Sequence, residues 1–226
     1  MDWVQEYQLF LFDFDGLLVD TEPLHCASYL EMSRRRGCPL NWDLERFCME
    51  AHGKSMGFFD GLEREYPDVF KSGPSKEELY AEKKRIYIEM LQSNRLELME
   101  GALPLLTALE ERGIKTAVVT NSPRDQIEII KRVLPDLQKI PVWITREDYT
   151  EAKPSPEGYQ KAIQMLAKPG DRIIGFEDTL KGLKALLAAG VEAVLVCSAD
   201  GERDKEALKL GARHCDKLSV LSTALR

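Results

Sequence analysis

The sequence predicts an α/β protein with a doubly wound parallel sheet and an inserted helical segment. From residue 101 onward, short β-branched runs alternate with helical stretches, which is the pattern of right-handed βαβ units. Residues 9–12 are all apolar, as expected of a strand buried on both faces of a parallel sheet. Between these regions, residues 22–93 show helical stretches and no convincing strand. We therefore predict a Rossmann-like core at residues 1–18 and 98–226, interrupted by an all-helical cap at residues 19–97.

The cap is predicted from four helical stretches, at residues 22–37, 44–50, 56–65 and 75–93. The loop before the last of them carries two prolines and a glycine. The last stretch opens with Ser75-Lys-Glu-Glu, which offers a capping box to the long charged helix that follows.

The core after the cap is predicted as strands separated by helices. The strands are expected at residues 115–120, 142–145, 172–176 and 192–196, and the helices at 102–112, 124–133, 156–167 and 179–189. Gly113 and Gly190 stand where two of these helices would end, since glycine readily adopts the left-handed conformation found there. In open α/β sheets, chemistry takes place at the C-terminal ends of the strands.

Composition favours a small-molecule partner. Lys and Arg total 31 against 38 Asp and Glu, a net charge of −7, which argues against nucleic acid or an anionic membrane surface. The five cysteines are odd in number and form no CxxC pair, so neither a disulfide framework nor a zinc site is expected. With no basic leader and no apolar stretch of membrane-spanning length, we expect a cytoplasmic protein, monomeric or alternatively a homodimer.

Two acids follow the first strand directly. Asp13 and Asp15 are two residues apart, so in extended chain their carboxylates point the same way, about 7 Å apart. Gly16 then allows a sharp turn. Acidic residues after a strand often only cap the next turn, but three later segments place chemically related residues after other apolar runs.

The first of these segments is AVVTNSP, at residues 117–123. Thr120 ends a predicted strand, and Asn121 and Ser122 open a helix, so a hydroxyl and backbone N–H groups would converge on an anion. A simpler reading makes Ser122 the N-cap with Pro123 at the first helical position, and one helix start can serve both purposes.

The other two segments supply a cation and more acids. In EAKPSPEGY, at residues 151–159, Lys153 precedes Pro154 and is held extended, although taken alone it reads as a solvated surface lysine. In IIGFEDTLKG, at residues 173–182, Glu177 and Asp178 offer hard oxygen ligands from a different strand. The alternative for Asp178 is a plain helix cap.

In this order and with these residues, the chain resembles the haloacid dehalogenase superfamily of phosphate-transferring enzymes. The branch it resembles carries a helical cap and includes sugar-phosphate phosphatases and β-phosphoglucomutases. The resemblance spans nearly the whole chain, and its DxDG…DT and GFED segments are highly specific, whereas a lone TNS or KP would be weak. It implies an active site beneath the cap, which excludes water and selects substrates.

Within that resemblance, the residues take definite roles. Asp13 is expected to be the nucleophile that forms an aspartyl-phosphate, and Asp15 the general acid and base. Mg²⁺ would be held by Asp13, the backbone carbonyl of Asp15, and Asp178 with Glu177 beside it. Thr120 would bind the transferred phosphoryl group, and Lys153 would neutralise both that group and Asp13. The acid at position 15 argues for phosphate esters, because dehalogenating members lack it.

The residues of the predicted cap do not decide between a phosphatase and a mutase. His25, in the segment DTEPLH, would contact the substrate or the Asp15 loop, although a helical histidine more often only packs. Gly53 and Lys54 lie in the loop where a mutase would carry an arginine for a second phosphate, but Met56 stands at the expected position. The alternative is that Lys54 replaces the arginine, since a point charge can bind phosphate without a bidentate fork. We expect a phosphatase acting on a small phosphorylated metabolite, such as a sugar phosphate or nucleoside monophosphate. The alternative is a hexose-phosphate mutase, and the intact site disfavours a non-catalytic phosphate-binding regulator.

Overall fold

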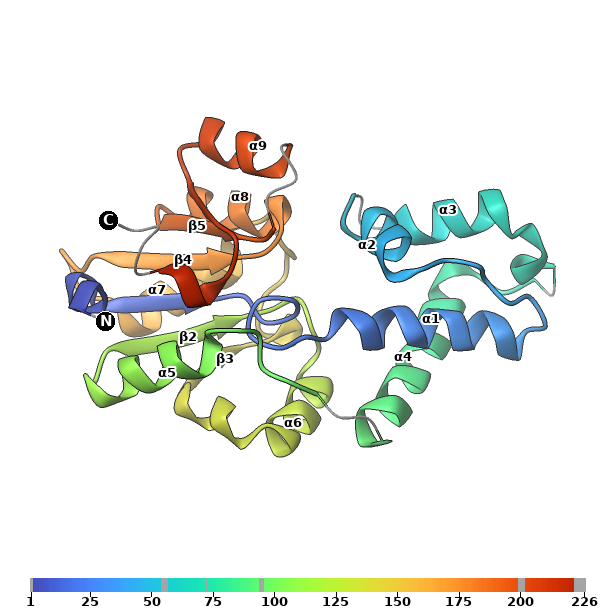
Figure 1. Ribbon diagram of the computed structural model, residues 1–226, viewed down its shortest axis with the longest axis horizontal. Coiled ribbons are helices and arrows are strands. Elements are labelled where there is room, and N and C mark those ends of the chain that lie inside the picture. The colour runs from blue at the N-terminus through green and yellow to red at the C-terminus, as the bar shows by residue number, and fades with distance from the viewer. Residues whose placement is uncertain (1, 54–56, 72, 94–95, 199–201, 222–226) are drawn as a thin grey trace. The chain divides into compact units, whose positions relative to one another are not determined.

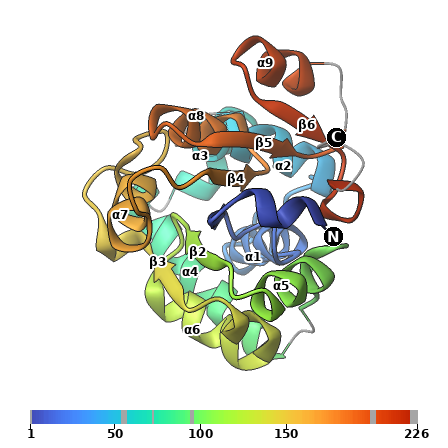
Figure 2. The same ribbon diagram turned by 90° about the vertical axis from the view of Figure 1, so that its left-hand side faces the viewer.

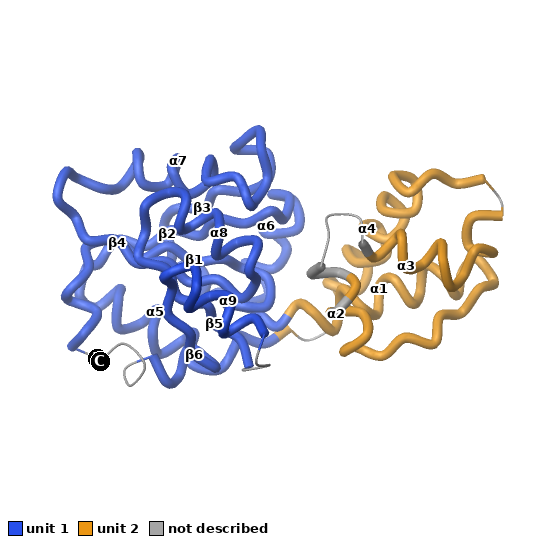
Figure 3. Tube along the Cα trace, turned by 90° about the horizontal axis from the view of Figure 1, so that it is seen from above, with its two compact units in different colours: residues 1–20, 97–226 blue, residues 21–96 orange. Residues whose placement is uncertain are grey.

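The chain forms two compact units in the computed structural model, which describes residues 2–53, 57–71, 73–93, 96–198 and 202–221. Residues 1–20 with 97–226 make unit 1, and residues 21–96 make unit 2 (Figure 3). The boundaries predicted from sequence, 18/19 and 97/98, fall within two residues of these division points. That unit 2 acts as a substrate-selecting cap stays a prediction.

Unit 1 is built on a six-stranded parallel sheet with the order β3-β2-β1-β4-β5-β6. The strands are β1 (Leu9–Phe12), β2 (Lys115–Val119), β3 (Val142–Ile144), β4 (Ile173–Glu177), β5 (Glu192–Val196) and β6 (Arg213–Cys215). The chain runs outward from β1 to β3 and then crosses to β4 on the other side of β1. Such a reversal of strand order is where open α/β sheets bind ligands. The predicted fold class is confirmed.

Helices cover both faces of this sheet. They are α5 (Ala102–Glu111), α6 (Arg124–Val133), α7 (Glu157–Leu166), α8 (Leu180–Ala188) and α9 (Arg203–Lys209), with short 3-10 helices η1 (Asp2–Glu6), η3 (Pro135–Lys139), η4 (Arg146–Asp148) and η5 (Leu218–Val220). Figure 2 shows α7 and α8 on one side of the sheet and α5 and α6 on the other. Both faces of the sheet must be covered at its centre, because all four residues of β1 are apolar and buried.

Side chains of β1 alternate between two core layers. Leu9 and Leu11 belong to the cluster that packs beneath α7 and α8. Phe10 and Phe12 point to the opposite face, where each stacks on Phe176 of β4 with ring centroids 5.9 and 5.4 Å apart. Strand β1 is thereby fixed from both sides, so the residues that follow it are held at a defined place.

The C-terminal strand β6 and helix α9 had no counterpart in the sequence prediction, which ended at residue 196. The three residues of β6, Arg-His-Cys, contain no apolar run. They form a strand because the edge of β5 offers backbone partners: Val196 pairs with Cys215, and the Cys197 N–H donates to the Cys215 carbonyl at 3.1 Å. Local sequence does not encode this pairing.

Unit 2 is helical over its described residues (Figure 1). It contains α1 (Glu22–Arg35), α2 (Leu44–Gly53), α3 (Gly57–Glu65), η2 (Pro67–Phe70) and α4 (Lys76–Ser93). An aromatic cluster fills its core, including Tyr29, Trp42, Phe47 and Phe58. The predicted capping box at the start of α4 is confirmed, since Ser75 and Glu78 exchange backbone-to-side-chain hydrogen bonds of 2.8 and 3.2 Å.

The two connections between the units run side by side. The Asp20 N–H donates to the Glu97 carbonyl at 3.0 Å, and the Met99 N–H donates to the Leu18 carbonyl at 2.9 Å. Across the described ranges, no helix is both long and apolar enough to cross a bilayer.

Candidate active site

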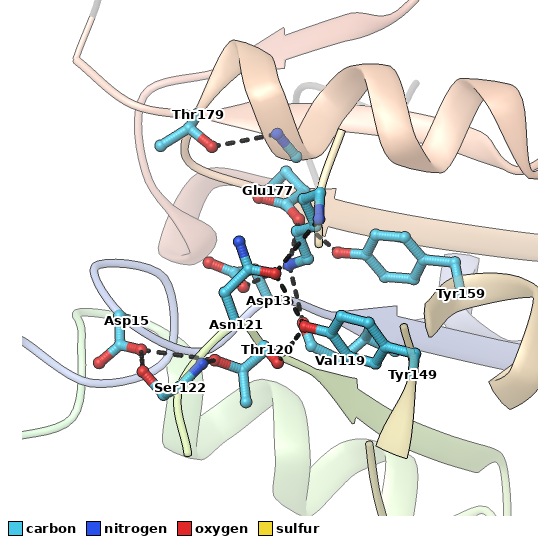
Figure 4. A network of polar contacts seen from close by, with 12 residues as sticks. Asp13, Asp15, Val119, Thr120, Asn121, Ser122, Tyr149, Tyr159, Glu177 and Thr179 are labelled. Atoms are coloured by element: carbon cyan, nitrogen blue, oxygen red, sulfur yellow. Dashed lines mark hydrogen bonds and ion pairs between the residues drawn. The ribbon is translucent and has the colours of Figure 1, made fainter. Parts of the chain in front are cut away.

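The structure gathers most of the predicted site residues at the C-terminal ends of the strands of unit 1 (Figure 4). Asp13 and Asp15 follow β1, Thr120 follows β2, and Glu177 is the last residue of β4. Two backbone bonds hold these strand ends in register: the Asp13 N–H donates to the Phe176 carbonyl, and the Thr120 N–H donates to the Ile144 carbonyl, both at 3.0 Å.

Lys153 lies at the centre of this group. Its ammonium donates to Asp13 Oδ1 at 2.5 Å, to Glu177 Oε1 at 2.6 Å and to the Val119 carbonyl at 2.8 Å. These three acceptors use all three of its hydrogens. Only 7% of the side chain is exposed, so the reading of Lys153 as a solvated surface charge is wrong. A phosphate that contacts Lys153 directly must replace one of these bonds.

Lys153, Asp13 and Glu177 shift one another's pKa values. Burial alone would lower the pKa of Lys153, but the carboxylates of Asp13 and Glu177 raise it above its usual value. Lys153 is therefore an ammonium ion at neutral pH. Burial raises the pKa of Asp13, although the Lys153 charge opposes this. Burial, reinforced by the charge of Asp13, raises the pKa of Glu177 to about 7.

A second buried residue supports Glu177. The Tyr159 hydroxyl, from α7, donates a short hydrogen bond to Glu177 Oε1, and both side chains are inaccessible to solvent. The Lys153 ammonium also lies 4.9 Å from the centre of the Tyr159 ring. Sequence reasoning missed Tyr159, because an apolar-looking position in an amphipathic helix gives no signal of a role in the site.

The acidic residues fit a divalent cation. Asp13, Glu177 and Asp178 each present a carboxylate oxygen, and these atoms all lie within 4.8 Å of one another. When all three carboxylates are ionised, they and the Lys153 ammonium carry a net charge of −2, which a divalent cation would balance. Among the residues that the structure describes, Glu177 Oε2 is buried without a hydrogen-bond partner, a costly state for an acceptor that a nearby cation would relieve. Hard oxygen ligands of this kind suit Mg²⁺.

Helix capping does not explain Asp178. The N-cap of α8 is Thr179, whose Oγ1 accepts a hydrogen bond from the Gly182 N–H at 3.2 Å. The alternative interpretation of Asp178 as a plain N-cap is therefore wrong, and its carboxylate belongs to the acidic cluster.

Two hydroxyls converge beside this cluster. Ser122 Oγ donates to Asp15 Oδ2 at 2.5 Å, and Thr120 Oγ1 donates to the same oxygen at 3.4 Å. The Ser122 N–H donates to Thr120 Oγ1 at 2.9 Å and so fixes the turn. Ser122 does not cap α6, as one reading of the sequence expected, because the N-cap position is Pro123 and the helix begins at Arg124. Both hydroxyls thus face the Asp15 carboxylate, and their contact with phosphate stays a prediction.

The side-chain oxygen of Asn121 is held by two neighbouring groups, and its predicted contact with phosphate stays a prediction. Its Oδ1 accepts from the backbone N–H of Lys153 at 3.3 Å and lies 2.8 Å from the Tyr149 hydroxyl. Tyr149, which sequence reasoning also missed, lies 2.7 Å from the Thr120 carbonyl. Burial raises its pKa to about 12, so it remains a hydroxyl. The side-chain oxygen of Asn121 thus ties the Lys153 loop to the end of β2.

The predicted cap residues His25, Gly53 and Lys54 belong to unit 2. His25 stacks on Tyr87 with ring centroids 4.1 Å apart, and its Nδ1 lies 2.6 Å from the Nζ of buried Lys83. Since an ammonium only donates, Nδ1 is the acceptor and the ring proton lies on Nε2. Gly53 is the last residue of α2, and Lys54 and Met56 lie outside the described residues.

Comparisons with known proteins agree with this geometry. A family model described as haloacid dehalogenase-like hydrolase matches residues 7–190. A phosphorylated carbohydrates phosphatase of Thermotoga maritima is 30% identical, with 81% of this chain and 82% of that protein covered. A validoxylamine A 7′-phosphate phosphatase of Streptomyces hygroscopicus subsp. limoneus is 31% identical over 89% of this chain and 91% of that protein.

A solved structure shares the fold. CbbY of Rhodobacter sphaeroides, crystallised with phosphate, superposes with a TM-score of 0.76 over 95% of this chain and 96% of that one, at 24% identity. The chain belongs to the haloacid dehalogenase-like hydrolases. The predictions of the family and of a hydrolytic enzyme are thereby confirmed.

Proposed function

We propose that this protein is a Mg²⁺-dependent phosphatase that hydrolyses a small phosphomonoester, with a phosphorylated carbohydrate as the leading substrate class. The observation that carries the proposal is the set of Asp13, Glu177 and Asp178, whose carboxylate oxygens lie within 4.8 Å of one another, with the Lys153 ammonium joining Asp13 to Glu177. The two relatives above are named as phosphatases of phosphorylated carbohydrates and of validoxylamine A 7′-phosphate.

Asp13 would act as the nucleophile. Its oxygen forms a bond to phosphorus while the ester P–O bond breaks, and Asp15 gives a proton to the departing alcohol. Water then attacks the aspartyl-phosphate, Asp15 takes a proton from that water, and phosphate leaves. Bound Mg²⁺ supplies positive charge that lets a carboxylate approach a phosphate dianion.

The groups of this chain would hold the reacting atoms in place. Lys153 fixes Asp13 through the 2.5 Å bond to Oδ1. Asp13, Asp178 and Glu177 would hold the metal together with the backbone carbonyl of Asp15, Glu177 through its Oε2. The hydroxyls of Thr120 and Ser122, which meet at Asp15 Oδ2 in the structure, would donate to the phosphoryl oxygens instead.

A panel of phosphorylated metabolites, assayed for phosphate release with Mg²⁺, tests the proposal. We expect release from sugar phosphates, none after Asp13→Asn, and full activity for Glu128→Gln, a matched amide variant at an exposed carboxylate of α6. Label from ¹⁸O-water should appear in the released phosphate. Isomerisation of a hexose 1-phosphate faster than phosphate release would instead establish a mutase. Phosphate binding without any turnover would establish a non-catalytic protein.

A further inference from the structure

Gln126 is a buried polar residue next to the candidate site that the catalytic scheme does not use. It lies in α6, one helical turn after Ser122, and is 5% exposed. Its Nε2 donates to Ser122 Oγ at 3.3 Å. Its backbone N–H is satisfied separately, by Asp125 Oδ1 at 2.8 Å.

The hydrogen bonds of Ser122 determine what Gln126 must present to it. A serine hydroxyl carries one hydrogen and rotates freely, so its direction depends on its neighbours. Here that hydrogen is given to Asp15 Oδ2 at 2.5 Å (Figure 4). The group behind the oxygen must therefore donate, and this assigns the amide NH₂ of Gln126, not its carbonyl oxygen, to Ser122.

We propose that Gln126 is a positioning residue that aims the Ser122 hydroxyl at the phosphoryl group of the substrate. With a donor on one side, the hydroxyl can direct its hydrogen only toward the anion on the other side. That anion is the Asp15 carboxylate in the structure, and a phosphoryl oxygen takes its place when substrate binds. The inference rests on the proposed function, because it takes Ser122 as a phosphate ligand.

Gln126→Met tests the role, since methionine keeps the length of the side chain and removes the donor. Two quantities are measured: the affinity for inorganic phosphate with Mg²⁺, by isothermal titration calorimetry, and kcat and KM for a sugar phosphate that the wild type hydrolyses. We expect phosphate to bind about tenfold more weakly, and kcat/KM to fall about tenfold, mainly through KM. Gln138→Met, at an exposed position of η3, is the matched control and should change neither.

A double-mutant cycle separates positioning from packing. In a Ser122→Ala background there is no hydroxyl to orient, so Gln126→Met should change phosphate affinity by less than about twofold. An equal loss in both backgrounds, or no loss in the wild-type background, would overturn the proposal. If the methionine variant does not fold, Gln126→Glu replaces it. Its carboxylate accepts the Ser122 hydrogen and turns it away from the site, so the loss should be larger.

The outcome also separates this inference from the proposed function. A wild type that hydrolyses sugar phosphates, with a normal Gln126→Met variant, refutes only the positioning role. A wild type that neither binds inorganic phosphate with Mg²⁺ nor releases it from any ester refutes the proposed function, and the positioning role with it.

Discussion

Gly182→Ala should destabilise the protein although alanine is the better helix former. Gly182 lies in the first turn of α8, and a Cβ added there would overlap the Glu177 carboxylate, whose Oε2, Cδ and Oε1 are its three nearest atoms. That carboxylate cannot swing aside freely, because Lys153 holds it at 2.6 Å and the Tyr159 hydroxyl bonds to the same oxygen. The added methyl group must therefore break part of the buried network.

The magnitude follows from two opposing effects. Disrupting a buried ion pair costs about 3–5 kcal/mol, and the gain from glycine to alanine in a helix is about 1 kcal/mol. We expect the free energy of unfolding to fall by about 2–4 kcal/mol, measured by urea denaturation. Gly61→Ala is the matched control, because a new Cβ there meets the end of the flexible Glu50 side chain at 2.9 Å and the Trp42 ring only at 3.3 Å, and it should change the free energy of unfolding by less than about 1 kcal/mol.

The same substitution in a Glu177→Ala background is the decisive comparison. Without the Glu177 carboxylate nothing is displaced, so Gly182→Ala should be neutral or stabilising, by up to about 1 kcal/mol. An equal loss of stability in both backgrounds would refute the reasoning, because the cost would then come from elsewhere in α8.

Three further predictions concern the site. Asp178→Ala should raise the Mg²⁺ concentration needed for half-maximal phosphate release and lower kcat, and EDTA should abolish wild-type release; full activity in chelator would contradict this. Glu177 has its pKa raised from 4.5 to about 7, so the folded protein binds its proton more tightly than the unfolded chain does. Metal-free protein should therefore lose stability as pH rises from about 4.5 to about 7, more steeply than Glu177→Gln; urea midpoints with equal pH dependence would be evidence against it. Tyr159→Phe removes the buried donor to Glu177 and should cost about 2 kcal/mol in urea unfolding, while an unchanged midpoint would show that the bond contributes nothing.

The main elements of the fold could be predicted from sequence because their signals are local. A run of apolar residues such as Leu9–Phe12 marks a strand buried on both faces, and the alternation after residue 101 marks βαβ units. Glycines that end helices are an equally local signal: Gly113 and Gly190 adopt left-handed φ values of 62° and 78° after their helices, as predicted. The strand β6 could not be predicted, because its three residues become a strand only by pairing with β5.

The sequence by itself determined which residue types follow each strand of the core, and so the acids at 13, 15, 177 and 178, the hydroxyls at 120 and 122, and the lysine at 153. Only the tertiary structure decided how they are used. It satisfies all three hydrogens of Lys153 with protein oxygens, turns the Asn121 side-chain oxygen to the Lys153 loop, and brings in Tyr149, Tyr159 and Gln126, to which the sequence assigns no role. The physical reason is that hydrogen bonds and ion pairs depend on distances of about 3 Å between groups far apart in the chain, and packing sets those distances.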